Sequence, residues 1–228
     1  MNKLVEHVKS SLGDAEALKT KLTEEIFELR GMSGKKTRIF YNNICSMEDA
    51  RYLEIGTWAG STVCSAMYKN KMKCLCMDNW SWNKKPQKRQ GQNTGPKDEF
   101  LKNFNKYKGE NDADFLEGDC WDHDPSKLGK FNIYMYDGKH TTEATTRALT
   151  HYISCMDDEF IYMVADWNMS HLTKKVKLGT MKGIEECGLE VLWSKGINTD
   201  HAKRKKTGGC KDGWWNGIGI FVLKKGNK

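Results

Sequence analysis

Residues 51–60, Arg-Tyr-Leu-Glu-Ile-Gly-Thr-Trp-Ala-Gly, constrain the fold of this chain more than any other segment. A short apolar run that carries an acid is followed at once by a Gly-x-x-x-Gly turn, and a helical pattern then runs from Ser61 to Tyr68. This order predicts a strand, a tight turn and a helix start with unpaired backbone N–H groups. Because glycine lets the backbone pass close to a ligand, the turn is either a plain structural connection or one wall of a cofactor site.

The acid in this segment, Glu54, bears on which cofactor such a turn would hold. A nucleotide phosphate favours a glycine turn and helix start without a neighbouring negative charge. A ligand that carries an amino group and a sulfonium favours the charge. The segment therefore favours S-adenosylmethionine over NAD or ATP, although taken alone it supports the structural interpretation equally well.

The composition limits the class of protein. With 228 residues, of which 38% are hydrophobic and 29% charged, we expect one domain with a sizeable core. Within it we expect an N-terminal helical extension (1–48) followed by a Rossmann-like core (49–228). No apolar run reaches the length of a membrane span, and no signal-peptide pattern is visible. The eight cysteines form no CxxC pair and no zinc-binding spacing, which predicts reduced thiols and a cytoplasmic location.

The net charge of +7 raises the question of nucleic-acid binding. Lysine and arginine cluster at residues 84–89 and 203–206. Acidic residues are interspersed over most of the chain, however, and no RNA-binding motif occurs. A lysine-rich solvated surface is therefore the preferred interpretation.

Strand and helix patterns alternate along the chain. Strands are expected at 51–55, 73–77, 113–117, 131–136, 159–165, 189–194 and 217–223, and helices at 60–69, 97–107, 141–155 and 171–187. This alternation predicts an α/β fold with a doubly wound, mostly parallel sheet. The last two strands are joined by a loop without a helix, which permits an antiparallel strand at the edge.

The N-terminal extension is expected to be helical. Residues 3–29 read as a helix in two pieces broken near Gly13, with Asp14 capping the second piece and Leu18, Leu22, Ile26 and Leu29 on one face. A short helix is expected at 37–46. Further along, Pro96 suits a first helical turn, Ser170 a cap, and Gly188 a helix end.

Two long polar segments interrupt the alternation, 79–96 and 195–216. Loops of this length inside a compact domain are often binding loops. They carry tryptophans that are either an aromatic platform for an acceptor molecule or packing residues: Trp80, Trp82, Trp214 and Trp215.

Five successive strands of the expected sheet each end in an acidic residue, namely Glu54, Asp78, Asp119, Asp137 and Asp166. The carboxyl ends of parallel strands meet at one edge, which is where ligands bind in such sheets. Five carboxylates at one edge repel one another, so a cation or a ligand rich in hydroxyl and amino groups would stabilise them.

The acids and their neighbours suggest separate roles. Asp78 is placed to accept hydrogen bonds from the ribose hydroxyls of an adenosine. Asp119 is placed to accept one from an adenine amine, and Gly118 would allow the adenine to approach closely. Trp80 either covers the adenine or anchors its loop on the surface. The full set expected to bind a cofactor is Glu54, Gly56, Thr57, Trp58, Gly60, Ser61, Asp78, Asn79, Trp80, Gly118, Asp119, Cys120 and Asp137.

Asp137 and Asp166 end neighbouring strands, and with the amide of Asn168 they would suit Mg²⁺ or another divalent cation. His140, three residues beyond Asp137, is a candidate general base, as is His171. The alternatives are a helix-capping or adenine-side role for His140 and a solvated helix start for His171. Asp137, His140 and Asp166 are thus the predicted catalytic residues.

Together, residues 54–60, Asp78, Gly118-Asp119, Asp137-Gly-Lys-His140 and Asp166 resemble the class I S-adenosylmethionine-dependent methyltransferases. The Asp-Gly-x-His sequence is most similar to the macrocin and mycinamicin sugar O-methyltransferases, whose layout resembles that of catechol O-methyltransferases. The resemblance covers about residues 50–225. It also extends to methyltransferases of large algal viruses that modify rhamnose-containing glycans, which would place the protein in the host cytoplasm.

The resemblance implies a seven-stranded sheet with the last strand antiparallel, S-adenosylmethionine as donor, and a sugar or polyol hydroxyl as acceptor. It also implies a metal held by Asp137 and Asp166. One position departs from the pattern, because Trp167 stands where an acid or amide is usual next to the last metal ligand. The expected function is therefore glycan O-methylation. A small phenol or nucleic acid as acceptor, a cofactor-binding module without catalysis, and a homodimer all stay open.

Overall fold

The computed structural model describes residues 2–81, 95–168, 172–198 and 212–226. A seven-stranded sheet forms its centre, with strand order β3-β2-β1-β4-β5-β7-β6. The strands are β1 (Arg51–Ile55), β2 (Lys73–Asp78), β3 (Asp112–Glu117), β4 (Phe131–Tyr136), β5 (Met156–Ala165), β6 (Leu189–Ile197) and β7 (Ile218–Lys225). The β1 to β5 pairs are parallel, whereas β7 runs antiparallel to both of its neighbours. The predicted Rossmann-like sheet with an antiparallel last strand is confirmed.

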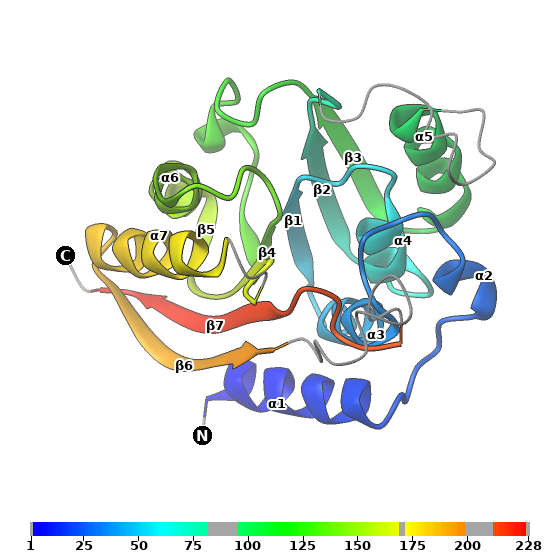
Figure 1. Ribbon diagram of the computed structural model, residues 1–228, viewed down its shortest axis with the longest axis horizontal. Helices are drawn as coiled ribbons and strands as arrows, with labels where there is room; N and C mark the ends of the chain where they lie inside the picture. The colour runs from blue at the N-terminus through cyan, green and yellow to red at the C-terminus, as the bar shows by residue number, and fades with distance from the viewer. Residues whose placement is uncertain (1, 82–94, 169–171, 199–211, 227–228) are drawn as a thin grey trace.

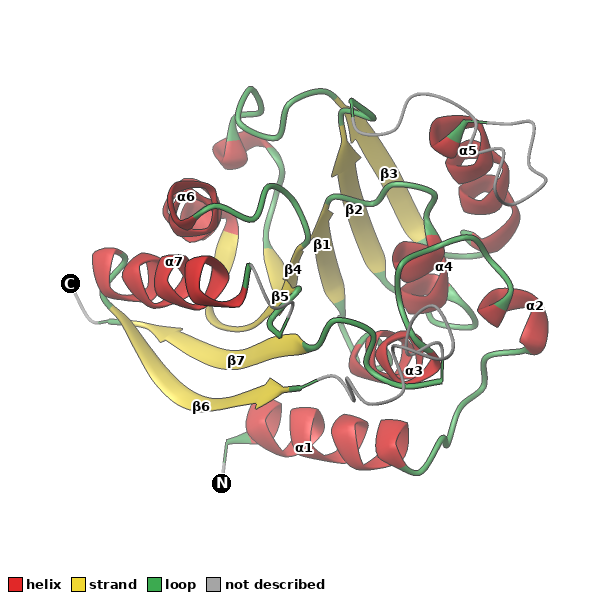
Figure 2. Ribbon diagram, viewed as in Figure 1, coloured by secondary structure: helices red, strands yellow, loops and turns green. Residues whose placement is uncertain are grey.

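Helices cover both faces of this sheet (Figure 1). They are α1 (Lys3–Glu16), α2 (Glu24–Phe27), α3 (Lys35–Ile44), α4 (Ser61–Met67), α5 (Pro96–Tyr107), α6 (Thr142–Tyr152) and α7 (Thr173–Glu186). Figure 2 shows α6 and α7 on one side of the strands and α3, α4 and α5 on the other, with α1 beside β6. None of the described helices is both long and apolar enough to cross a membrane.

The apolar strand residues divide into two cores because successive side chains of a strand point to opposite faces. In β4, Ile133 and Met135 pack with the helices of the N-terminal half, whereas Tyr134 and Tyr136 pack with α6 and α7. The central strands therefore read as nearly continuous apolar runs, as expected for a sheet that is buried on both faces.

The predicted break near Gly13 is wrong. Helix α1 runs through Gly13 to Glu16, and a Cβ at Gly13 would meet no atom within 4 Å. One glycine costs a helix about 1 kcal/mol relative to alanine, and the packed face of Val5, Val8 and Leu12 offsets that cost.

The chain then turns at Leu18, which is 51% exposed and has a φ of 55°. Consequently Asp14 caps no second helix, and Leu18, Leu22, Ile26 and Leu29 do not share one helical face.

Other expected features hold in part. Pro96 opens α5, and Gly188 follows α7 with a φ of 60°, as expected. The helix expected at 141–155 is α6 followed by a 3₁₀ turn (Ile153–Cys155), and the one expected at 37–46 lies at Lys35–Ile44. Ser170, His171, Trp82 and the two lysine clusters lie outside the described residues.

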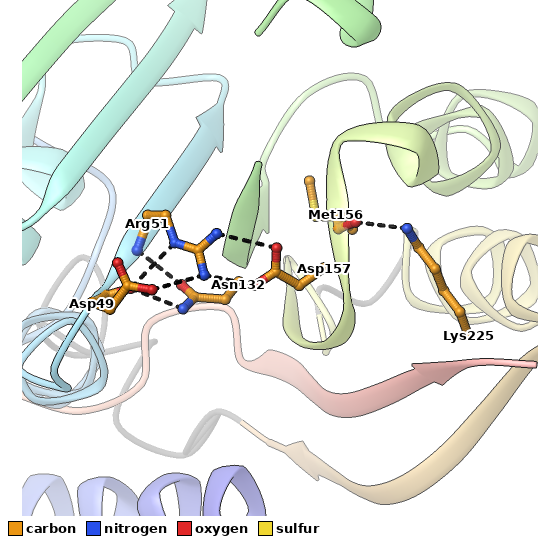
Figure 3. A network of polar contacts seen from close by, with 6 residues as sticks. All are labelled: Asp49, Arg51, Asn132, Met156, Asp157 and Lys225. Atoms are coloured by element: carbon orange, nitrogen blue, oxygen red, sulfur yellow. Dashed lines mark hydrogen bonds and ion pairs between the residues drawn. The ribbon is translucent and has the colours of Figure 1, made fainter. Parts of the chain in front are cut away.

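The amino-terminal edge of the sheet is held by a polar network around Arg51 (Figure 3). Its guanidinium donates to both oxygens of Asp157, at 3.1 and 2.7 Å. The side chain of Asn132 accepts from the Arg51 backbone N–H at 2.8 Å and donates to the Asp49 carbonyl at 2.9 Å. This network joins β1, β4 and β5 at the edge opposite the strand-end acids.

Candidate active site

A cavity of about 50 Å³ lies at the carboxyl edge of the sheet. This is room for a few water-sized groups, so it would enclose only one end of a cofactor-sized ligand. Four segments line it: the glycine turn with the start of α4, the residues 32–41 before and within α3, the ends of β4 and β5, and the turn 214–217 before β7. The structure thus brings the predicted glycine turn together with Asp137 and Asp166.

The first glycine of the turn is required by packing. Gly56 has a φ of 90°, and a Cβ there would come within 2.2 Å of the Asp137 carbonyl oxygen. The turn therefore lies directly against the residue that ends β4. Trp58 also has positive φ, 47°, which is costly for a bulky side chain. Such strain is typical of functional sites.

Glu54 is fully buried beneath the turn. It accepts hydrogen bonds from the Tyr52 hydroxyl at 2.5 Å and the Thr62 hydroxyl at 2.7 Å. Burial raises the pKa of Glu54 to about 7 despite these donors. Thr62 lines the cavity and Glu54 does not, so direct contact between Glu54 and a cofactor stays a prediction.

Asp78 ties the glycine turn to the loop after β2. Its Oδ2 accepts from the Trp58 backbone N–H and its Oδ1 from the Trp80 backbone N–H, both at 2.7 Å. Burial raises the pKa of Asp78. The backbone N–H groups of Asn79 and Thr57 also stabilise this carboxylate, and its role in binding ribose hydroxyls stays a prediction.

Trp80 is a loop anchor in the structure. It is 5% exposed, and its indole N–H donates to the Trp58 carbonyl at 2.7 Å. Its ring packs against Phe100 and Phe115, with centroids 5.2 and 6.3 Å away. Of the two roles considered for Trp80, the structure displays the anchoring one, although the anchor lies in the core and not on the surface. Its neighbour Asn79 is exposed.

The end of β3 adjoins the end of β2, since Gly118 donates its N–H to the Asp78 carbonyl at 3.2 Å. Asp119 is exposed and accepts from the Trp121 backbone N–H at 3.1 Å. Burial raises the pKa of the Cys120 thiol to about 12, so this thiol is neutral near pH 7. The adenine-side roles of these residues stay predictions.

Asp137, His140 and Asp166 form a cluster in which one ligand atom of each lies within 4.8 Å of the others. The His140 Nε2 atom is 3.3 Å from Asp137 Oδ1 and 3.6 Å from Asp166 Oδ2. Burial raises the pKa of Asp137 to about 6. Burial lowers the pKa of His140, but the two carboxylates outweigh it and raise that pKa above its usual value.

Trp167 follows Asp166 at the position where an acid or amide is usual in the family that the sequence resembles. Trp167 is 8% exposed and packs against Phe221, with ring centroids 5.6 Å apart. The amide that contacts Asp166 comes from Asn216, whose Nδ2 donates to Asp166 Oδ1 at 2.7 Å. Asn168 donates its backbone N–H to the Asn216 carbonyl at 2.8 Å, and its role as a metal ligand stays a prediction.

Sequence reasoning missed residues 32–41, which lie before and within α3, as part of the site. Met32, Ser33, Thr37 and Tyr41 all line the cavity. Arg38 holds this segment in place by donating to the carbonyls of Ile26 and Leu29, at 2.8 and 3.0 Å, and to the Ser33 hydroxyl at 2.9 Å.

Gly31, directly before this segment, lies over the start of α4, where a Cβ would come within 1.8 Å of the Ser61 hydroxyl. The closely spaced glycines, Gly31 and Gly34, were the available sequence signal for this close packing.

Comparison with known proteins establishes the fold alone. No protein-family model matches the chain, and no curated protein does. Among solved structures, the SAH-bound methyltransferase PaMTH1 of Podospora anserina is similar with a TM-score of 0.53 and 12% identity, over 100% of this chain and 89% of that one. TrmN from Thermus thermophilus has the same score and identity, over 88% of this chain and 52% of that one.

A third similar structure is the ribosomal protein L11 methylase of Lactobacillus delbrueckii subsp. bulgaricus. Its TM-score is 0.50 at 9% identity, over 85% of this chain and 79% of that one. The chain spans about half the length of TrmN. It therefore has the Rossmann-like fold seen in S-adenosylmethionine-dependent methyltransferases, and its own activity and acceptor are matters for proposal.

Proposed function

We propose that this protein is an S-adenosylmethionine-dependent O-methyltransferase that acts on a hydroxyl of a sugar or glycan, for which rhamnose is the first candidate. The observation that carries the proposal is that Asp137 and Asp166 line one cavity with the glycine turn, while His140 Nε2 lies 3.3 and 3.6 Å from an oxygen of each. Methyl transfer to oxygen needs a base or a cation next to the donor's methyl group, and this cluster offers a candidate base together with carboxylates that could hold a cation. The free cysteines among the described residues fit a cytoplasmic enzyme.

S-adenosylmethionine supplies an activated methyl group on a positively charged sulfur. When the carbon–sulfur bond breaks and the carbon–oxygen bond forms, the acceptor hydroxyl loses its proton. His140 Nε2 is buried and, among the described residues, has no hydrogen-bond partner of good geometry, so it is available to take that proton. The adjacent carboxylates, 3.3 and 3.6 Å away, then stabilise the imidazolium.

The cluster also fits a divalent cation. Carboxylate oxygens together with an imidazole nitrogen are common ligands of such ions. Asp137 and Asp166 are the residues that would hold it, with Asn168 as a third candidate, and the ion would lower the pKa of a bound hydroxyl. His140 faces both carboxylates and is assigned here as the base.

Asp78 and the glycine turn would bind the donor. The two backbone N–H groups on Asp78 fix its carboxylate, so little side-chain entropy is lost when ribose hydroxyls bind. A small phenol is the second candidate acceptor, because Met32, Tyr41 and Trp214 give the cavity an apolar and aromatic wall.

The proposal is tested first by calorimetric titration with S-adenosylhomocysteine (SAH), and absence of binding would refute it. Methyl transfer from radiolabelled S-adenosylmethionine is then measured on rhamnosides, catechol and RNA, with chelator and with added Mg²⁺. We expect methyl transfer to the rhamnoside. His140→Gln should lower the rate of this transfer and leave the affinity for SAH unchanged. Full activity in the presence of chelator would rule out a role for the cation. Methyl transfer to catechol alone would favour the small phenol as the acceptor.

A further inference from the structure

We propose that Asn216 is a positioning residue that holds the carboxylate of Asp166 toward His140, and that the N-terminal extension fixes Asn216 in that position. The inference rests on the proposed function, since it concerns the same acid cluster. It adds a residue from the far end of the chain to that cluster.

The two oxygens of Asp166 have different partners. Oδ1 accepts the hydrogen bond from Asn216 Nδ2 at 2.7 Å, and Oδ2 is the oxygen 3.6 Å from His140 Nε2. The hydrogen bond on the first oxygen therefore sets the direction of the second. Asp166 has a φ of 55°, so its backbone is strained and external contacts are needed to hold it.

The turn that carries Asn216 is itself tightly held. Trp215 and Gly217 have φ values of 54° and 82°, and a Cβ at Gly217 would come within 2.4 Å of the Ile197 carbonyl oxygen. The Asn216 carbonyl accepts from the Asn168 backbone N–H at 2.8 Å, which ties the turn to the residues after β5. Asn216 is 8% exposed. Its amide is therefore presented by a backbone that has few alternative conformations.

The N-terminal extension closes the other side of the turn. The indole N–H of Trp214 donates to Glu16 Oε1 at 2.8 Å, and the Trp214 ring lies 6.0 Å from that of Phe40. Gly213 accepts from the Lys36 backbone N–H at 3.2 Å. Helices α1 and α3 thus hold the turn from outside the sheet, which links the extension to Asp166 through Asn216.

Loss of the Asn216 amide would leave Asp166 Oδ1 without this donor and the carboxylate free to rotate. Residues that orient the ligands or bases of a site typically change affinity or activity about 10–100-fold when they are replaced. We expect Asn216→Ala to lower kcat by about that factor while the KM for S-adenosylmethionine and the affinity for SAH stay the same, because the hydrogen bond that is lost goes to Asp166.

Asn132→Ala is the matched control (Figure 3). Asn132 is a buried asparagine, 6% exposed, whose Nδ2 also donates within the protein, at the opposite edge of the sheet. The variant Asn132→Ala should lower the free energy of unfolding and leave both kcat and the position of Asp166 unchanged. Asn216→Asp, which keeps the shape and replaces the donating amide by a carboxylate, should resemble Asn216→Ala.

Crystal structures of the wild type, Asn216→Ala and Asn132→Ala, grown with SAH, decide the inference. Movement of Asp166 Oδ2 away from His140 in Asn216→Ala alone supports it. An unmoved Asp166 in that variant, or an equal displacement in Asn132→Ala, overturns it. If the wild type fails to bind SAH, the proposed function is lost, yet the position of Asp166 in the three structures still decides whether Asn216 orients it.

Discussion

Trp214 and Glu16 are 198 residues apart in the sequence and are joined by a hydrogen bond of 2.8 Å from the indole N–H to Oε1. Glu16 is the last residue of α1, and Trp214 lines the cavity at the carboxyl edge of the sheet. Glu16 also pairs with Lys36 at the start of α3. The N-terminal extension is therefore one wall of the candidate active site.

The coupling between these two residues can be measured. Trp214→Phe keeps a ring against Phe40 and removes the N–H, and Glu16→Ala removes the acceptor. A hydrogen bond of this kind contributes about 0.5–1.5 kcal/mol, or more when the acceptor is charged. We expect a double-mutant cycle in urea unfolding to give a coupling free energy of about 1 kcal/mol. Additive effects of the two substitutions would show that the bond is not made in solution.

Glu54 should make stability depend on pH. Burial raises its pKa from 4.5 to about 7, so between these values the folded state binds a proton that the unfolded state has released. This contribution to stability is fully present below about pH 4.5 and is lost as pH rises through about 7. Above about pH 7 the ionised Glu54 destabilises the folded state by about 3 kcal/mol, the free energy that corresponds to the whole pKa shift.

Glu54→Gln removes this titration. The unfolding free energy of the variant, relative to the wild type, should therefore be higher at pH 8 than at pH 5, by up to about 3 kcal/mol. Urea unfolding followed by circular dichroism at the two pH values measures the difference. The same relative stability at both pH values would contradict the assigned cause.

Asp78→Asn should weaken cofactor binding. The carboxylate accepts two backbone N–H groups, and an amide has one oxygen and one NH₂ group, which would face a backbone N–H. We expect the affinity for SAH to fall at least about tenfold, which is about 1.4 kcal/mol. Asp112→Asn, at the exposed start of β3, is the control and should leave it unchanged. Unchanged affinity in Asp78→Asn would rule out the ribose role.

The fold was largely predictable because its signals are local. Strands buried on both faces appear as apolar runs, and glycines and acids mark their ends. The break placed at Gly13 failed because the packing of Val5, Val8 and Leu12 decided the helix, and a single glycine does not.

The site residues were likewise predictable only where the signal in the sequence is local. Asp137 and Asp166 could be placed together because neighbouring parallel strands end at one edge. Asn216 and Tyr41 could not, because their positions depend on contacts between distant segments, such as Trp214 with Glu16. The departure at Trp167 indicated that the amide comes from another position, for which the sequence suggested Asn168, and nothing in the sequence pointed to Asn216.

The two roles considered for Trp80 give opposite results for Trp80→Phe. As an anchor, Trp80 donates its indole N–H to the Trp58 carbonyl at 2.7 Å and thereby supports the glycine turn. Phenylalanine keeps an aromatic ring but loses this donor. We expect the unfolding free energy to fall by about 1 kcal/mol and SAH affinity to fall several-fold, because the turn that holds Trp58 against Asp78 is loosened. Trp121→Phe, outside the glycine turn, should keep that affinity. If Trp80 instead covers the adenine, the phenyl ring still stacks and calorimetric titration of Trp80→Phe will show SAH affinity close to that of the wild type.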